Sequence, residues 1–84
     1  MQNGEKKQNI IITYRQRAEI SGVKFITLLD EERILLDTEM GDLMIEGKEL
    51  KLENLEKNNG AVTLFGKIDG VFYVEKRRKN KGRR

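Results

Sequence analysis

The chain has 84 residues, a formal net charge of +3, 37% hydrophobic and 37% charged residues, and no Cys, His, Pro or Trp. A chain of this length forms one domain at most, and it buries only about 60% of its unfolded surface on folding. Without Cys and His it cannot form disulfides, thiolate metal sites, zinc fingers, haem sites, a Cys nucleophile or a Ser-His-Asp triad.

The beginning of the chain is polar and lacks the apolar core and small-residue cleavage site of a signal peptide. No stretch approaches the ~20 apolar residues that a membrane helix needs. We therefore expect a cytoplasmic protein whose residues 1–9 are disordered. From residue 10 onward, glycines divide the chain into segments of strand length. Residues 14–20 and 23–29 are two of the expected strands.

Residues 30–40 support two interpretations. Asp30-Glu31-Glu32 is typical of a turn before a β-favouring run at residues 34–38, but Asp30 is also a good cap for a short helix over residues 31–40. Thr38 and Gly41 disfavour the helix, so we predict turn and strand. Residues 49–55 are equally open, because Leu50 and Leu52 alternate as in a strand, whereas Leu55 breaks the phase and the Glu, Lys and Leu content suits a helix.

A local repeat gives the clearest pattern. Residues 41–47 and 60–66 both read Gly-x-apolar-x-apolar-x-Gly, nineteen residues apart. The inner apolar residues of each copy are two positions apart, which is the period of a strand. Two copies are too few for a solenoid, so we predict two similar strands of one sheet.

From Val62 to Val74, every even position is apolar or glycine. This pattern predicts one long strand that keeps a single apolar face and bends at Gly66 and Gly70. A hairpin that turns at Asp69-Gly70 is the alternative, but its pairing would mix the two faces. The whole pattern predicts an all-β single domain: a meander, sandwich or roll of six to seven short strands with disordered termini.

Charge is divided unevenly along the chain. Residues 76–84 hold seven of the seventeen basic residues and no acid, whereas residues 1–75 hold ten bases and all fourteen acids. The tail has no apolar residue and should be disordered when free. Its positive charge favours binding to an anionic membrane surface or to phosphates. The alternative is that the tail serves only to keep the protein soluble. No aromatic residue is interleaved for base stacking and the body is acidic, which argues against nucleic acid.

The acidic residues between positions 30 and 42 do not form a recognisable catalytic pattern. A paired-carboxylate hydrolase needs two acids in a cleft with separated pKa values, and a small sheet has little room for one. The sequence has no calcium-binding loop and no phosphate loop. Tyr14 and Tyr73 are isolated phenols. We therefore expect no enzyme, no metal and no cofactor.

An ordered series of motifs covers about residues 15–75: Ser21-Gly22-Val23-Lys24, Asp30-Glu31-Glu32, Leu35-Leu36-Asp37-Thr38, Gly41-x-Leu43-x-Ile45-x-Gly47, Leu50, Leu55, Gly60, Leu64-x-Gly66-x-Ile68-Asp69 and Tyr73. The series resembles the YabP/YqfC family of sporulation proteins, and more closely its YabP branch. The resemblance implies a small cytoplasmic protein of endospore-forming bacteria that is not known as an enzyme and travels with a membrane-protein partner. The chain departs from the family pattern in its basic tail and in Gly70, where a larger residue is expected.

We therefore divide the chain into a disordered N-terminus at residues 1–9, a YabP-like β domain at 10–75 and a basic disordered tail at 76–84. We expect it to act in spore formation through protein–protein contacts, with a membrane-protein partner or at an anionic membrane surface. Two alternatives remain: a self-assembling, coat-like structural protein, and a nucleic-acid-binding accessory protein that uses the tail.

The residues predicted to matter fall into three groups. Partner contact is assigned to Asp30, Glu31 and Glu32, because they form an exposed acidic turn. Gly22, Gly41, Gly47 and Gly66 are assigned to turns and bulges that shape the sheet. Contact with an anionic surface is assigned to the basic residues of the tail: Lys76, Arg77, Arg78, Lys79, Lys81, Arg83 and Arg84.

Overall fold

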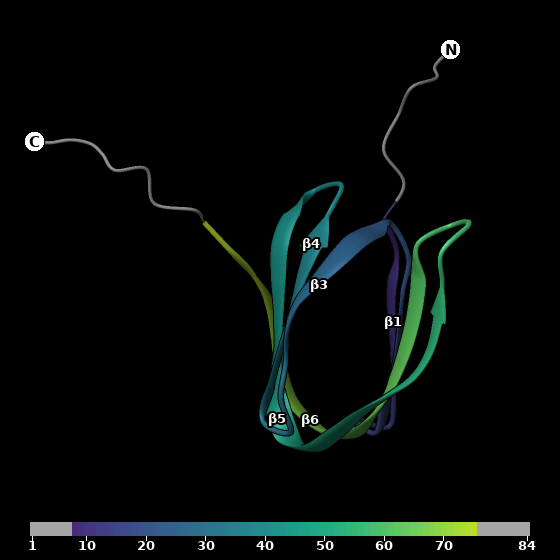
Figure 1. Cartoon of the computed structure of the whole chain (residues 1–84). Helices are drawn as coiled ribbons and strands as arrows, with labels where there is room; N and C mark the ends of the chain where they lie inside the picture. The colour runs from purple at the N-terminus through teal and green to yellow at the C-terminus, as the bar shows by residue number, and fades with distance from the viewer. Residues whose placement is uncertain (1–7, 76–84) are drawn as a thin grey trace, which may run out of the picture.

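The computed structural model describes residues 8–75, and these fold into one antiparallel sheet of six strands without a helix. The strands follow the sheet in the order β1-β2-β6-β5-β4-β3 (Figure 1). Their bounds are β1 Ile10–Thr13, β2 Arg17–Ile20, β3 Val23–Leu29, β4 Arg33–Thr38, β5 Gly41–Glu56 and β6 Ala61–Val74. The all-β prediction is therefore confirmed, and the parts of the predicted termini at residues 1–7 and 76–84 lie outside the described residues.

The sheet folds over on itself because its two long central strands bend. Figure 1 shows β5 and β6 running together along the bottom of a U and rising on both sides. We call one side half-sheet A: β3, β4, residues 41–48 of β5 and residues 67–74 of β6. The other side is half-sheet B: β1, β2, residues 61–66 of β6 and residues 50–56 of β5. The fold is thus a sandwich made from a single sheet.

The two copies of the sequence repeat occupy corresponding places in the two halves. Residues 41–47 begin β5 in half-sheet A, and residues 60–66 lead into and begin β6 in half-sheet B. Their inner apolar residues point into the space between the halves and are fully buried, as the two-residue period predicted: Leu43, Ile45, Val62 and Leu64. Apolar side chains of both halves complete the core: Ala18, Ile20, Val23, Ile34, Leu36, Leu50 and Ile68.

The long-strand prediction for residues 62–74 is confirmed, but its single apolar face is wrong. Between the pairs Glu46–Gly70 and Gly47–Ile68 the register shifts, so Asp69 is an extra residue in β6. Such a bulge moves all later side chains to the opposite face. Ile68, which precedes the bulge, is buried, whereas Phe72, which follows it, lies on the outer face of half-sheet A and is 45% exposed.

Two regions that the sequence left open are also strands. Residues 33–38 form β4, so the helix considered over residues 31–40 is absent. Residues 49–55 lie within β5, and the change of phase at Leu55 comes from a register shift between Leu52 and Asn54. The expected strand at 14–20 is shorter than predicted, because Tyr14 and Arg15 have positive φ angles of 52° and 57° and form a turn with Gln16.

Candidate functional site

The predicted contact residues Asp30, Glu31 and Glu32 lie together on the exposed turn between β3 and β4. An oxygen of the Asp30 carboxylate accepts a hydrogen bond from the backbone N–H of Glu32 at 2.9 Å. The carbonyl oxygens of Glu31 and Glu32 accept hydrogen bonds from the N–H groups of Leu50 (2.8 Å) and Gly47 (3.0 Å). The turn therefore supports the bend of β5 through its backbone, and contact with a partner through its side chains stays a prediction.

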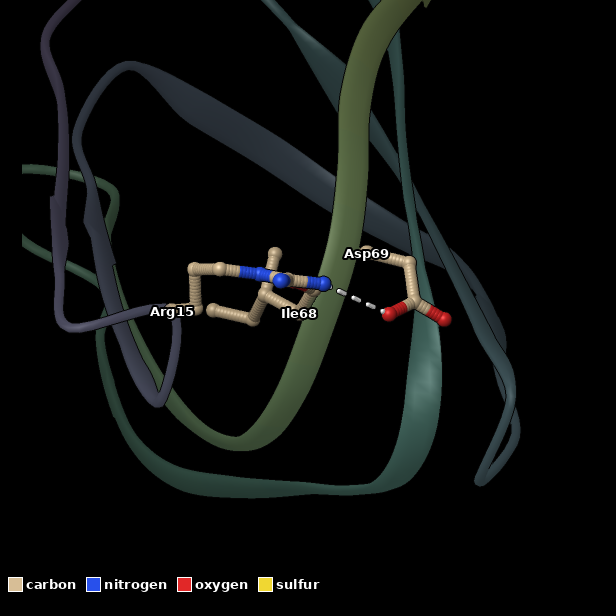
Figure 2. Close-up of polar contacts among 3 residues, drawn as sticks. All are labelled: Arg15, Ile68 and Asp69. Atoms are coloured by element: carbon tan, nitrogen blue, oxygen red, sulfur yellow. Dashed lines mark hydrogen bonds and ion pairs between the residues drawn. The ribbon is translucent and has the colours of Figure 1, made fainter.

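The turn between β1 and β2 supports the bend of β6 in the same way. The carbonyl oxygens of Gln16 and Arg15 accept hydrogen bonds from the N–H groups of Gly66 (3.1 Å) and Ile68 (2.8 Å). The Arg15 side chain adds a clamp on the bulge, shown in Figure 2: its Nε donates to the Ile68 carbonyl and its Nη2 lies 3.0 Å from the Asp69 carboxylate. No local pattern in the sequence predicts this contact, because Arg15 and Asp69 are 54 residues apart.

Removing the Arg15 clamp should lower the free energy of unfolding. We expect Arg15→Ala to lose about 1–2 kcal/mol, the sum of a modest ion pair and a hydrogen bond to a backbone carbonyl. Asp69→Asn is the control, and it should lose less than about 1 kcal/mol because the bond to Ile68 remains. Urea titration of both variants measures the difference, and equal losses would show that the backbone bond adds nothing.

The four shape-determining glycines lie at turns and bends. Gly22, Gly41 and Gly66 have φ angles of 77°, 120° and 137°, in the region that favours glycine. Gly47 is placed by close packing instead, because a side chain there would meet the Lys67 carbonyl. Sequence reasoning missed Gly60 in this role, although a Cβ at Gly60 would meet the carbonyl of Val23.

The sheet ends at two strands that pair on one side only, β1 and β3. β1 is Ile10-Ile11-Ile12-Thr13 and carries no charge, and its Ile11 and Ile12 are 55% and 42% exposed. β3 has the single charge of Lys24 and exposes Phe25, Leu28 and Leu29. Exposed edges of this kind are usually blocked by Lys, Pro or a covering segment, and they otherwise serve as templates for pairing.

The outer face of half-sheet A carries a row of apolar side chains that the sequence analysis missed. The strand registers place four of them directly opposite one another across four strands: Leu28, Leu35, Met44 and Phe72. Their alignment depends on pairing between distant segments and on the bulge at Asp69. No local periodicity marks it.

Two features that define other functional classes are not found in the described chain. Across residues 8–75 no three acidic side chains come together in a way that suits a metal ion. The same residues include no helix that is long and apolar enough to cross a membrane. The basic residues predicted to contact an anionic surface, from Lys76 to Arg84, lie outside the described residues.

Comparison with known proteins gives two consistent matches. A family model described as the YabP family matches residues 4–80 of the chain. The chain is also 30% identical over 78 residues to the spore protein YabP of Bacillus subtilis (strain 168). That alignment covers 93% of this chain and 78% of the relative.

Proposed function

Because the chain belongs to the YabP family of sporulation-related proteins, we propose that it acts in spore formation as a non-catalytic adaptor that binds a partner protein. The partner that the family resemblance implies is a membrane protein, which would bring this protein to the membrane periphery of the sporulating cell. The basic tail would assist by attraction to an anionic surface.

The main support for the proposal is the pair of end strands, β1 and β3, which pair with no further strand of residues 8–75; at β3 the first N–H, that of Val23, donates to the Gly60 carbonyl at 2.9 Å. β1 is uncharged and exposes Ile11 and Ile12, and β3 exposes three large apolar side chains with one lysine. A partner strand that pairs with such an edge gains backbone hydrogen bonds and pockets for alternate side chains. A small domain also gains stability from such association, because its own core is limited.

The chemistry of the side chains supports a role without catalysis. The chain has no His or Cys, so carboxylates are its main acid–base groups. A carboxyl group that acts as a general acid is usually held in apolar surroundings. None of the carboxylates in residues 8–75 is buried.

A charge placed on the β1 edge tests the proposal. We expect Ile11→Lys to reduce the yield of heat-resistant spores at least tenfold when the variant gene replaces the native one, because a lysine on an edge strand opposes pairing with another strand. Thr63→Lys is the matched control. Thr63 lies on the same face of the sheet as Ile11 and in the same cross-strand row, but it belongs to the central strand β6. Spore yield should be near normal in this variant.

Circular dichroism of both purified variants ensures that the comparison concerns binding and not folding. Normal spore yield with a folded Ile11→Lys protein would contradict a role for the β1 edge. Equal loss in both variants would point to a function of the outer face of half-sheet B instead.

A further inference from the structure

The apolar row on half-sheet A runs across the whole width of that half. Leu28 and Phe72 at its two ends are 39% and 45% exposed, and Leu35 and Met44 between them are half-buried. Phe25 lies on the same face and is 66% exposed. Neighbouring strands are about 4.8 Å apart, so the row is about 14 Å long, the length of two to three helical turns.

The outer face of half-sheet B offers a direct comparison within the same molecule. One of its rows contains Thr13, Arg17, Phe65 and Lys51, and the next contains Ile11, Glu19, Thr63 and Asn54. Ile11 and Phe65 are thus the large apolar side chains in these two rows, and the other six residues are polar or charged. Phe65 is 39% exposed and already has a charged neighbour, because the Arg17 guanidinium lies 5.6 Å from the centre of its ring. A solvated outer face of an antiparallel sheet is normally polar in this way. The apolar row of half-sheet A departs from that rule, as binding surfaces do.

Charged side chains border the apolar row on both sides. Asp37 and Asp42 lie directly opposite each other in the adjacent row on one side. On the other side Glu46 lies opposite Arg33. The hollow beside Asp37 and Asp42 is also lined by Lys24, Glu39 and Glu75, so carboxylates outnumber basic groups beside the row. This charge would repel an anionic lipid surface, and it would repel the same face of a second copy.

We propose that the outer face of half-sheet A docks an amphipathic helical segment of the partner protein, one whose apolar stripe is flanked by Lys or Arg. The apolar stripe covers Leu28, Leu35, Met44 and Phe72, and the basic side chains lie beside Asp37, Asp42 and Glu46. This proposal rests on the proposed adaptor function and specifies a surface and a partner chemistry for it. The charge pairs at the rim determine which helical segment binds. Phe72 becomes buried in the complex and supplies most of the affinity.

The test uses the full-length, ¹⁵N-labelled protein and two synthetic fourteen-residue helical peptides with the same Leu stripe. One peptide carries Lys on both sides of the stripe and the other carries Glu. We expect the Lys peptide to give saturable amide shifts centred on the row, and the Glu peptide to bind about tenfold or more weakly. The residues that should shift are Leu28, Leu35, Met44 and Phe72.

Two matched variants separate this face from general attraction to an acidic protein. Phe72→Ser should weaken the Lys peptide by about tenfold or more, as loss of an aromatic anchor does. Phe65→Ser changes an aromatic of the same strand with similar exposure, 39% against 45%, and should leave binding within about twofold. Glu46→Lys should weaken the preference for the Lys peptide, because it replaces one of the flanking carboxylates by a positive charge. This variant tests the same face if Phe72→Ser does not fold.

Several outcomes would overturn the proposal. They are the absence of saturable binding, shifts on half-sheet B, and equal effects of Phe72→Ser and Phe65→Ser. Amide shifts confined to β1 or β3 would contradict docking on the outer face of half-sheet A. They would still agree with an adaptor that binds its partner through a strand edge. Binding to phosphatidylglycerol vesicles that depends on Phe72 would identify a membrane as the occupant. Dimers in light scattering that Phe72→Ser abolishes would identify a second copy.

Discussion

Replacing Gly47 with alanine should destabilise the protein by about 3 kcal/mol or more, enough to leave a domain of this size close to unfolding. A Cβ at this position would be driven into the backbone carbonyl of Lys67 on β6 and would lie 3.0 Å from Cδ2 of Leu50. The carbonyl belongs to the neighbouring central strand and cannot rotate away as the end of a long side chain can. Relief would therefore require β5 and β6 to separate at their bend.

Gly70→Ala is the matched control for Gly47→Ala. Both glycines lie in the paired central strands β5 and β6, but a Cβ at Gly70 would have no heavy atom within 4 Å. Its φ angle is not in the left-handed region, so alanine should stabilise the protein by about 0.4–1 kcal/mol through the unfolded state. Urea unfolding followed by circular dichroism measures both. Similar midpoints for the two variants would contradict the close approach at Gly47.

These two glycines also show what the sequence can and cannot predict. The repeat marks Gly47 as a place where a strand is interrupted, and the buried residues between Gly41 and Gly47 follow from the two-residue period. What lies opposite Gly47 depends on pairing with β6, which begins fourteen residues later. The bend of β5 could therefore be predicted as a bulge, but the contact that requires glycine could not.

The same distinction explains the error at the end of β6. The alternation from Val62 to Val74 is real in the sequence, but the extra residue Asp69 exchanges the two faces. Arg15 holds that bulge from a turn 54 residues earlier. Local periodicity carries no information about such a distant anchor, so Phe72 was expected on the core side. The docking face proposed above is visible only once this exchange is known.

The predicted acidic contact residues illustrate a different limit. Their exposure and their turn conformation could be predicted from composition and order, and Asp30 makes the side chain-to-backbone hydrogen bond that such turns often contain. The contribution of Glu31 and Glu32 to the fold comes from their carbonyl groups, which every residue type has. Sequence alone therefore cannot separate a turn selected for its backbone from one selected for its charges.

Leu50 packs between the bend of β5 at Gly47 and the bend of β6 at Gly66. Leu50→Ala should therefore lower the free energy of unfolding by about 2–5 kcal/mol. Its side chain is 3% exposed, and its Cδ2 lies 2.9 Å from the Cβ position of Gly66 and 3.0 Å from that of Gly47. Leu50 thus fills the space that both glycines leave open where the half-sheets join. Truncation creates a cavity there, and the surrounding backbone cannot close it, because the β3–β4 turn holds the bend through its hydrogen bonds.

Leu55→Ala in the same strand is the control, because Leu55 is 41% exposed and should lose about 1 kcal/mol or less. Equal losses in urea unfolding would contradict a special role for Leu50. The double variant Gly47→Ala/Leu50→Ala distinguishes the two causes of the glycine requirement. If the Leu50 side chain alone demanded glycine, its removal would restore stability to the Gly47→Ala protein. We expect no such rescue, because the atom that Gly47 must avoid first is the Lys67 carbonyl oxygen, and shortening Leu50 leaves that backbone atom in place.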